Sequence, residues 1–279
     1  MEWPENLKKN IKKCSKCGLC QSVCPIYKIT GNECAVSKGK FVMLEGVIKS
    51  ELKLNKTIDK YLNMCSLCAK CKDFCPSKIN PPAIFNNFKY IYAKNSFLHK
   101  ILFKIQDEKI FNTLLNFTHF FTSKFYHTKS IKNSGKLKLL YFRGCADKIN
   151  PKNEISLKNL LSKHKNIELI EKDFDCCGVP FLSSGNLERF DRAKARNLEI
   201  INSTSHDFVI TNCASCEDNL KAYSEKINVI SVSKFLTDFK YKFESENKLR
   251  VTFHKPCHFH DYENVKKLLL NIKNIEYVE

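Results

Sequence analysis

Long apolar runs are missing from this sequence of 279 residues. No stretch approaches the roughly 18 apolar residues that a helix needs to cross a bilayer. The start of the chain, Met1–Glu5, is acidic and lacks the basic end and apolar segment of a secretory signal. Phosphate-binding loops, dinucleotide fingerprints and Ser/His/Asp nucleophile arrangements are also missing. We therefore expect a soluble, unexported protein without a nucleotide site or a serine nucleophile.

Cysteine, in contrast, is abundant, with 15 residues. An odd number of cysteines, mostly in tight clusters of an unexported protein, argues against a disulfide framework and for metal ligation in a reducing compartment. Two runs near the start share one spacing and end in proline: Cys14-x2-Cys17-x2-Cys20-x3-Cys24-Pro25 and Cys65-x2-Cys68-x2-Cys71-x3-Cys75-Pro76. Zinc sites usually use two separated cysteine pairs, so this spacing favours iron–sulfur clusters.

In such a run, three cysteines surround three corners of a cubane, and the fourth ligates the other cluster. The first [4Fe-4S] cluster is therefore expected to be bound by Cys14, Cys17, Cys20 and Cys75. The second is expected to be bound by Cys65, Cys68, Cys71 and Cys24. Cys34 fits neither run, and we interpret it as a small buried packing residue.

The chain is also poor in acidic residues, with 29 Asp and Glu against 47 Lys and Arg and a formal net charge of +18. Such an excess usually suggests nucleic acid or an anionic surface as partner. The lysines are scattered over the whole chain, however, and thiolate-ligated clusters would offset part of the charge. We therefore expect no nucleic-acid partner.

Apolar residues at helical spacing predict that residues 1–94 form an α-helical dicluster domain, with helices over Gly39–Ser50, Thr57–Met64 and Ile84–Tyr92. Residues 95–135 are expected to form a helical, aromatic-rich bridge that ends in a polar linker. This bridge can pack on its own protein, or it can offer a basic amphipathic face to a partner subunit or a membrane surface. The sequence leaves both possibilities open.

In residues 136–249, short apolar runs alternate with helical patterns, which is typical of a parallel sheet covered by helices. Predicted strands cover Leu137–Phe142, Ile167–Ile170, Phe208–Thr211 and Val229–Ser231, and a further strand is predicted at Val251–His254. Cysteines follow four of these five strands: Cys145, the pair Cys176-Cys177, Cys213 and Cys257. Because ligands of such folds lie beyond the carboxyl ends of the strands, a site is expected there.

An internal repeat marks the end of the chain. Leu157–Glu171 reads LKNLLSKHKNIELIE and Val265–Glu279 reads VKKLLLNIKNIEYVE, with eight of fifteen positions identical. Upstream of each copy, an apolar strand leads to a cysteine, Cys145 or Cys257. We therefore expect residues 250–279 to be the beginning of a second repeat that is truncated before its cysteine pair.

The spacing C-x30-C-C-G-x34-C-x2-C joins five cysteines with Gly178: Cys145, Cys176, Cys177, Cys213 and Cys216. This pattern resembles the cysteine-rich CCG domain of heterodisulfide reductase subunits. It also resembles the iron–sulfur subunits of glycolate oxidase, lactate oxidase and anaerobic glycerol-3-phosphate dehydrogenase. The segments CSKCGLCQSVCPIYKITGNE and CSLCAKCKDFCPS are similar to the two-cluster head of the glycolate oxidase subunit.

The resemblance implies a multidomain α and α/β architecture, with a helical ferredoxin-type head before a parallel α/β CCG domain. It implies that the five CCG cysteines bind a non-cubane iron–sulfur cluster or zinc, and the residue types do not decide between these metals. A metal-free group of thiols is the alternative, although converging thiols would oxidise readily. His254-Lys255-Pro256-Cys257-His258 resembles the DPCH start of the family's second motif, with Lys255 in place of Asp. His254, His258 and His260 are candidate ligands there, although we favour solvated loop histidines.

The resemblance further implies electron transfer from an FAD-containing dehydrogenase subunit through the clusters to quinone or another acceptor. Because no flavin fingerprint is present, hydride chemistry would need that partner, and no residue of this chain is expected to be catalytic. The favoured hypothesis is the iron–sulfur subunit of a flavin-dependent 2-hydroxy-acid oxidoreductase of the glycolate or lactate type. Alternatives are a heterodisulfide-reductase-like thiol–disulfide catalyst and a zinc-stabilised docking module. The expected location is the cytoplasm, including the inner face of the membrane.

Overall fold

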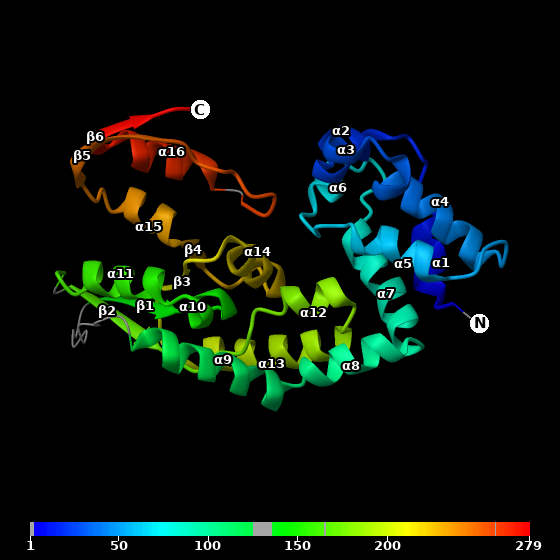
Figure 1. The fold of residues 1–279 in the computed structure, drawn as a ribbon, viewed down its shortest axis with the longest axis horizontal. Helices are drawn as coiled ribbons and strands as arrows, with labels where there is room; N and C mark the ends of the chain where they lie inside the picture. The colour runs from blue at the N-terminus through cyan, green and yellow to red at the C-terminus, as the bar shows by residue number, and fades with distance from the viewer. Residues whose placement is uncertain (1–2, 125–135, 165, 260) are drawn as a thin grey trace. The chain divides into compact units, whose positions relative to one another are not determined.

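The computed structural model describes residues 3–124, 136–164, 166–259 and 261–279, and these residues form two compact units (Figure 1). Unit 1 contains the chain up to Gln106 together with Pro180–Glu188. Unit 2 contains Asp107–Val179 and Arg189–Glu279. Among the described residues, none of the helices combines the length and the apolar character of a transmembrane segment. Most of the predicted polar linker before Lys136 lies outside the described residues.

Unit 1 is helical, as the spacing of its apolar residues predicts. Its helices are α1 (Glu5–Lys12), α2 (Leu19–Val23), α3 (Pro25–Thr30), the short 3-10 helix η1 (Glu33–Ala35), α4 (Ser37–Ile48), α5 (Lys56–Asn63), α6 (Lys70–Asp73), α7 (Pro81–Lys94) and α8 (Phe97–Ile105). Asn55 caps α5, because its side-chain oxygen accepts from the backbone N–H groups of Thr57 and Ile58 at 3.0 and 3.1 Å. Pro81, at the first position of α7, has no N–H group to leave unpaired.

The core of unit 1 joins α1, α4, α5 and α7 through Leu7, Phe41, Leu62, Phe85 and Phe88. The segment Pro180–Glu188, which includes most of α12 (Val179–Ser184), packs on α7 although it is distant in sequence. Gly185 has a φ of +79°, and a Cβ atom there would lie 2.8 Å from Cβ of Lys89. A larger residue would therefore separate this segment from α7.

Unit 2 contains a four-stranded parallel sheet, which confirms the predicted α/β fold. The strands are β1 (Leu137–Tyr141), β2 (Ile167–Glu171), β3 (Phe208–Thr211) and β4 (Val229–Ser231), in the order β2-β1-β3-β4. The helices of this region are α9 (Glu108–Ser123), α10 (Cys145–Ile149), α11 (Lys152–Leu161), α13 (Leu187–Ser203), α14 (Ala214–Tyr223) and α15 (Val232–Asp238). Within this unit, α11 and α15 cover one face of the sheet, and α9 and α13 the other (Figure 1).

Unit 2 ends in a separate two-stranded parallel sheet, formed by β5 (Phe243–Val251) and β6 (Ile272–Tyr277) around α16 (Tyr262–Leu270). The strand predicted at Val251–His254 is wrong in position, since β5 ends at Val251. Charged residues occupy every second position of β5 and most of its residues are exposed, so no apolar run marks it. Ile275 pairs with β5 at Leu249, and Ile167, at the same position of the repeat, pairs with β1 at Leu137.

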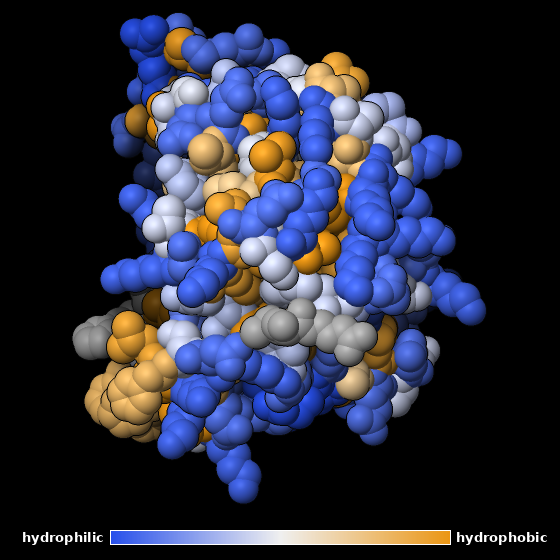
Figure 2. Space-filling view, turned by 90° about the vertical axis from the view of Figure 1, so that its right-hand side faces the viewer, coloured by the Kyte–Doolittle hydropathy of each residue, from blue (hydrophilic) through white to orange (hydrophobic). Residues whose placement is uncertain are grey.

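The expected bridge is divided between the two units: α8 belongs to unit 1 and α9 to unit 2. Both helices expose large apolar side chains, including Phe97 and Leu98 on α8 and Phe117 and Phe120 on α9. Hydrophilic residues dominate the face of the molecule seen in Figure 2, with apolar residues in small groups between them. This distribution agrees with the scattering of lysines along the sequence.

Candidate iron–sulfur sites

The two cysteine runs of unit 1 share a backbone conformation as well as a spacing. In the first run, Lys16 and Gly18 have φ values of 57° and 84°. In the second, Leu67 and Ala69 at the equivalent positions have φ values of 59° and 58°. Positive φ is unfavourable for residues other than glycine and is concentrated at functional sites. These paired turns curve each run around a centre, after which α2 or α6 carries the third cysteine.

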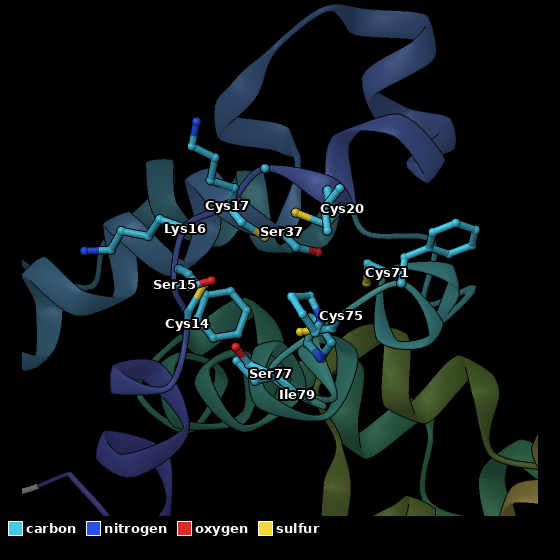
Figure 3. Close-up of a pocket in the computed structure, with 17 residues that line it drawn as sticks. Cys14, Ser15, Lys16, Cys17, Cys20, Ser37, Cys71, Cys75, Ser77 and Ile79 are labelled. Atoms are coloured by element: carbon cyan, nitrogen blue, oxygen red, sulfur yellow. The ribbon is translucent and has the colours of Figure 1, made fainter.

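Each run lines a cavity together with the fourth cysteine of the other run. The first cavity is lined by Cys14, Cys17, Cys20, Cys71 and Cys75 (Figure 3). The second cavity is lined by Cys24, Cys65, Cys68 and Cys71. Each cavity therefore contains all four cysteines expected for one cluster, and Cys71 borders both. In the described part of the chain, no three Cys, His, Asp or Glu side chains converge closely enough to hold a single metal ion.

The donor set of unit 1 fits iron–sulfur clusters, because soft thiolates are the ligands of these clusters. Burial raises the pKa of the Cys71 thiol to about 12, and it raises the pKa of Cys20 as well. The backbone N–H of Leu19 and the Ser15 side chain lower the pKa of the exposed Cys17. A bound cluster would hold all of these groups as thiolates. The identity of the ligands stays a prediction from the runs and from the lining of the cavities.

In unit 2, the structure brings the five CCG cysteines together. Cys145 begins α10 after β1, Cys213 precedes α14 after β3, and Cys216 lies one turn into α14. The thiols interact with one another in a chain: Cys145 with Cys176, Cys176 with Cys177, and Cys216 with both Cys177 and Cys213. The expectation of a site beyond the strand ends therefore agrees with the positions of these thiols.

These contacts separate the five thiols into acidic and weakly acidic groups. Donation by Cys216 lowers the pKa of Cys213 to about 6, supported by backbone N–H groups at the start of α14. Donation by Cys176 and Cys216 lowers the pKa of Cys177. The donors Cys145 and Cys216 have raised pKa values, and burial adds to both. Because metals bind thiolates, Cys177 and Cys213 are the groups most ready to ligate.

Two glycines allow the close packing of this site. A Cβ atom on Gly144 would lie 2.9 Å from Sγ of Cys216. Gly178, the glycine of the CCG sequence, has a φ of +90°, and its Cβ atom would lie 2.5 Å from Phe190. Any side chain at either position would displace a neighbouring side chain. The CCG motif therefore ends in glycine because a larger residue would not fit there.

A buried polar network supports the cysteine pair. The Cys177 carbonyl accepts from Oη of Tyr223 at 2.6 Å and also from the Asn219 side chain. The Cys176 carbonyl accepts from Nδ2 of Asn197 at 3.2 Å. Behind the pair, the fully buried Arg189 binds Asp175 at 2.6 Å, and Asp175 in turn accepts from the Cys176 N–H at 2.7 Å. The motif did not reveal these supporting residues, because they lie on other elements.

The remaining candidates lie apart from these sites. Cys34 is exposed, so its interpretation as a buried packing residue is wrong. The Asn32 side chain caps η1, and this turn buries Ala35 instead. Cys257 is half-buried, and Nδ1 of His258 lies 3.4 Å from Oδ2 of Asp218. His254 is exposed, and His260 lies outside the described residues.

Comparison with known protein families finds a match in each half of the chain. Residues 10–79 match the 4Fe-4S dicluster domain, and residues 139–221 match the cysteine-rich domain of the CCG family. No solved structure matches the chain.

Several relatives match almost the whole chain. A subunit of the fumarate reductase (CoM/CoB) of Methanothermobacter marburgensis is 26% identical over 97% of the chain and 57% of its own length. A subunit of the CoB–CoM heterodisulfide reductase of Methanosarcina acetivorans is 22% identical over 96% of the chain and 75% of its length. The probable glycolate oxidase iron–sulfur subunit of Bacillus subtilis is 20% identical over 95% of the chain and 76% of its own length. The chain thus spans little more than half of the fumarate reductase subunit, and its two matched segments are similar to a 4Fe-4S dicluster domain and to a CCG-type cysteine-rich domain.

Proposed function

We propose that the chain is the electron-transfer subunit of an oxidoreductase complex, in which two [4Fe-4S] clusters carry electrons from a flavin-containing dehydrogenase subunit to quinone or another acceptor. One observation carries this proposal: the fourth cysteine of each run lines the cavity of the other run. When bound, such clusters supply one-electron storage. The protein's own residues hold them, keep them apart and largely exclude water from Cys68 and Cys71.

For the partner's substrate we propose a 2-hydroxy acid such as glycolate or lactate. The name of the Bacillus subtilis relative supports this choice. Cys145, Cys176, Cys177, Cys213 and Cys216 would bind a third centre, a non-cubane iron–sulfur cluster or zinc. Two thiols with lowered pKa values, Cys177 and Cys213, and three neighbouring thiols offer soft ligands that suit either metal.

The partner has a candidate surface on α9. Its exposed apolar residues Ile110, Leu114, Phe117 and Phe121 follow each other at three- and four-residue spacing, so they form one stripe. We propose that this stripe contacts the flavin-containing subunit. Sedimentation of the reconstituted chain with anionic lipid vesicles, without complex formation with the flavoprotein, would instead assign the stripe to the inner membrane surface.

A second candidate function is thiol–disulfide catalysis at the CCG site. It is favoured by the buried chain of hydrogen-bonded thiols and by the relative named as a heterodisulfide reductase subunit. Disulfide reduction by the isolated, reconstituted chain with a one-electron donor would support this function. Zinc at the site, with no redox signal from it, would instead support a docking role for unit 2.

The proposal is tested by anaerobic reconstitution of the full chain with iron and sulfide, followed by iron and sulfide analysis and EPR spectroscopy. We expect two [4Fe-4S] clusters in unit 1. Cys75→Ser should damage the cluster bound by Cys14, Cys17 and Cys20, whereas Cys34→Ser, at an exposed cysteine outside both cavities, should damage neither. Damage confined to the cluster of the second run would contradict the crossed ligation. Electron uptake by the chain only when the purified flavoprotein and its substrate are present would support the subunit assignment.

A further inference from the structure

Two lysines of unit 1 are almost completely buried. Lys40 on α4 is 2% exposed, and Lys89 on α7 is 1% exposed. Lysine is rarely buried to this extent unless a negative group compensates its charge. Lys40 lines the second cavity beside Cys24, Cys65 and Cys71. The nature of the compensating group therefore decides what these lysines do.

Among the described residues, no carboxylate lies within ion-pair distance of Lys40 or Lys89 to compensate its charge. The negative groups that act on Lys40 are the thiols of Cys65, Cys24 and Cys71. Those that act on Lys89 are Cys65 and the buried carboxylate of Asp59. Nζ of Lys89 donates to the Ser183 carbonyl at 3.2 Å, which fixes the ammonium in the interior. As thiolates of a bound second cluster, these cysteines would thus be the main counter-charges of both lysines.

Burial also lowers the pKa of both lysines, that of Lys89 to about 8. With a pKa of about 8, Lys89 is still cationic at pH 7, and the thiolates of a bound cluster would favour the charged form of Lys40 as well. Their charges lie in a low-dielectric interior, where each acts more strongly on a neighbouring charge than it would in water.

The first cavity has a different charge environment. Its lysines are Lys16 and Lys38, whose side chains are 44% and 33% exposed. Lys16 binds Glu45 at 2.5 Å, and Lys38 lies 3.9 Å from Glu33. Exposed and paired charges are screened, so they contribute little to the potential inside a site.

We propose that Lys40 and Lys89 raise the reduction potential of the cluster bound by Cys65, Cys68, Cys71 and Cys24 above that of the other cluster, so that the electron rests on this second cluster. The inference depends on the proposed function, because it requires both clusters. Reduction adds one electron and one negative charge to a cluster, with no bond formed or broken. A buried cation stabilises the reduced form more than the oxidised form. The flavin of the partner is the electron donor in the complex, and dithionite takes its place in the test.

The experiment is an anaerobic redox titration of the reconstituted full chain at pH 7, followed by EPR. Lys40→Met and Lys89→Met keep an unbranched side chain and remove the charge. Each should lower the ratio of reduced to oxidised second cluster at least tenfold at a fixed potential, a shift of about 59 mV for one electron. Lys38→Met, on the same helix as Lys40 but beside the first cavity, should leave the second cluster unchanged. Lys40→Arg should restore most of the potential, because it restores the charge.

The order of reduction in the unmodified chain is an independent test. The EPR signal that appears first should be altered by Cys24→Ser and not by Cys14→Ser. The inference is overturned if the first signal instead responds to Cys14→Ser, or if both methionine variants bind two clusters at unchanged potentials. Absence of two clusters from the unmodified chain would refute the proposed function itself, so the two failures are distinguishable.

Discussion

In unit 1, three expected ligands of each cavity come from one run, where they are separated by two residues with a left-handed residue between them, and the fourth comes from the other run. In unit 2, the five cysteines follow three different strands, and only the parallel sheet brings them together. The first kind of site depends on local backbone conformation. The second depends on the packing of elements that are distant in sequence. Substitutions that disturb the sheet ends should therefore affect the second site and leave the first intact.

The largest effect is expected for Cys177→Ala. This thiol is fully buried and accepts from two neighbouring thiols, so its loss should abolish metal binding in unit 2. Structural metal binding contributes of order 10 kcal/mol to folding in small zinc modules, so the melting temperature should fall as well. Metal analysis, EPR and calorimetry of the full chain measure these effects. Full metal occupancy with an unchanged melting temperature would show that the five thiols are not a metal site.

Gly178→Ala should have the next largest effect. The added methyl group would meet Phe190 at 2.5 Å in a backbone region with φ of +90°, at a cost of roughly 1–3 kcal/mol in unfolding free energy. Gly31→Ala is a matched control, because Gly31 also has positive φ, +61°, but no neighbour within 4 Å. We expect urea denaturation to show a larger loss for Gly178→Ala, together with a change only in the metal signal of unit 2. Equal losses would mean that packing at the CCG motif contributes nothing.

Leu268→Ala tests whether the final strand–helix–strand unit is docked within unit 2. Leu268 on α16 packs against the core of the four-stranded sheet, so its truncation should cost about 2 kcal/mol and increase hydrogen exchange between Lys266 and Tyr277. Leu270→Ala, at a position 60% exposed on the same helix, should change little. Equal effects of the two substitutions would indicate that α16 is not packed on that core.

The smallest effect is expected for Tyr223→Phe. This change removes one hydrogen bond to the Cys177 carbonyl and keeps the ring in place, so about 1 kcal/mol of unfolding free energy should be lost. The first two cavities contain no part of this contact, so their EPR signals should not change. Altered EPR signals from unit 1 would show that a change at the CCG site affects the clusters of unit 1, so the two kinds of site would not be independent.

The sequence predicted those features that depend on short-range patterns. Apolar periodicity identified α4, α5 and α7 of unit 1 and the four strands of the parallel sheet, but not the short helices beside the cysteine runs or α1. Periodicity missed β5, because charged residues interrupt its apolar pattern. The interpretation of Cys34 as a buried residue was also wrong. The repeat led to the prediction that residues 250–279 begin a second repeat, and in the structure β5, α16 and β6 form a strand–helix–strand unit at this end of the chain. Domain boundaries and ligand assignments stay predictions.

By itself, the sequence determined the chemistry of the sites, because cysteine spacing and the following proline set the geometry of each run within a few residues. The tertiary structure alone decided which charges and supporting groups surround them. Lysine is usually exposed, so no pattern identifies Lys40 and Lys89 as buried cations. Tyr223 and Arg189 likewise support the CCG pair only through the packing of α13 and α14. Contacts between distant elements depend on how the whole core packs, and that information is spread over many residues rather than held in one motif.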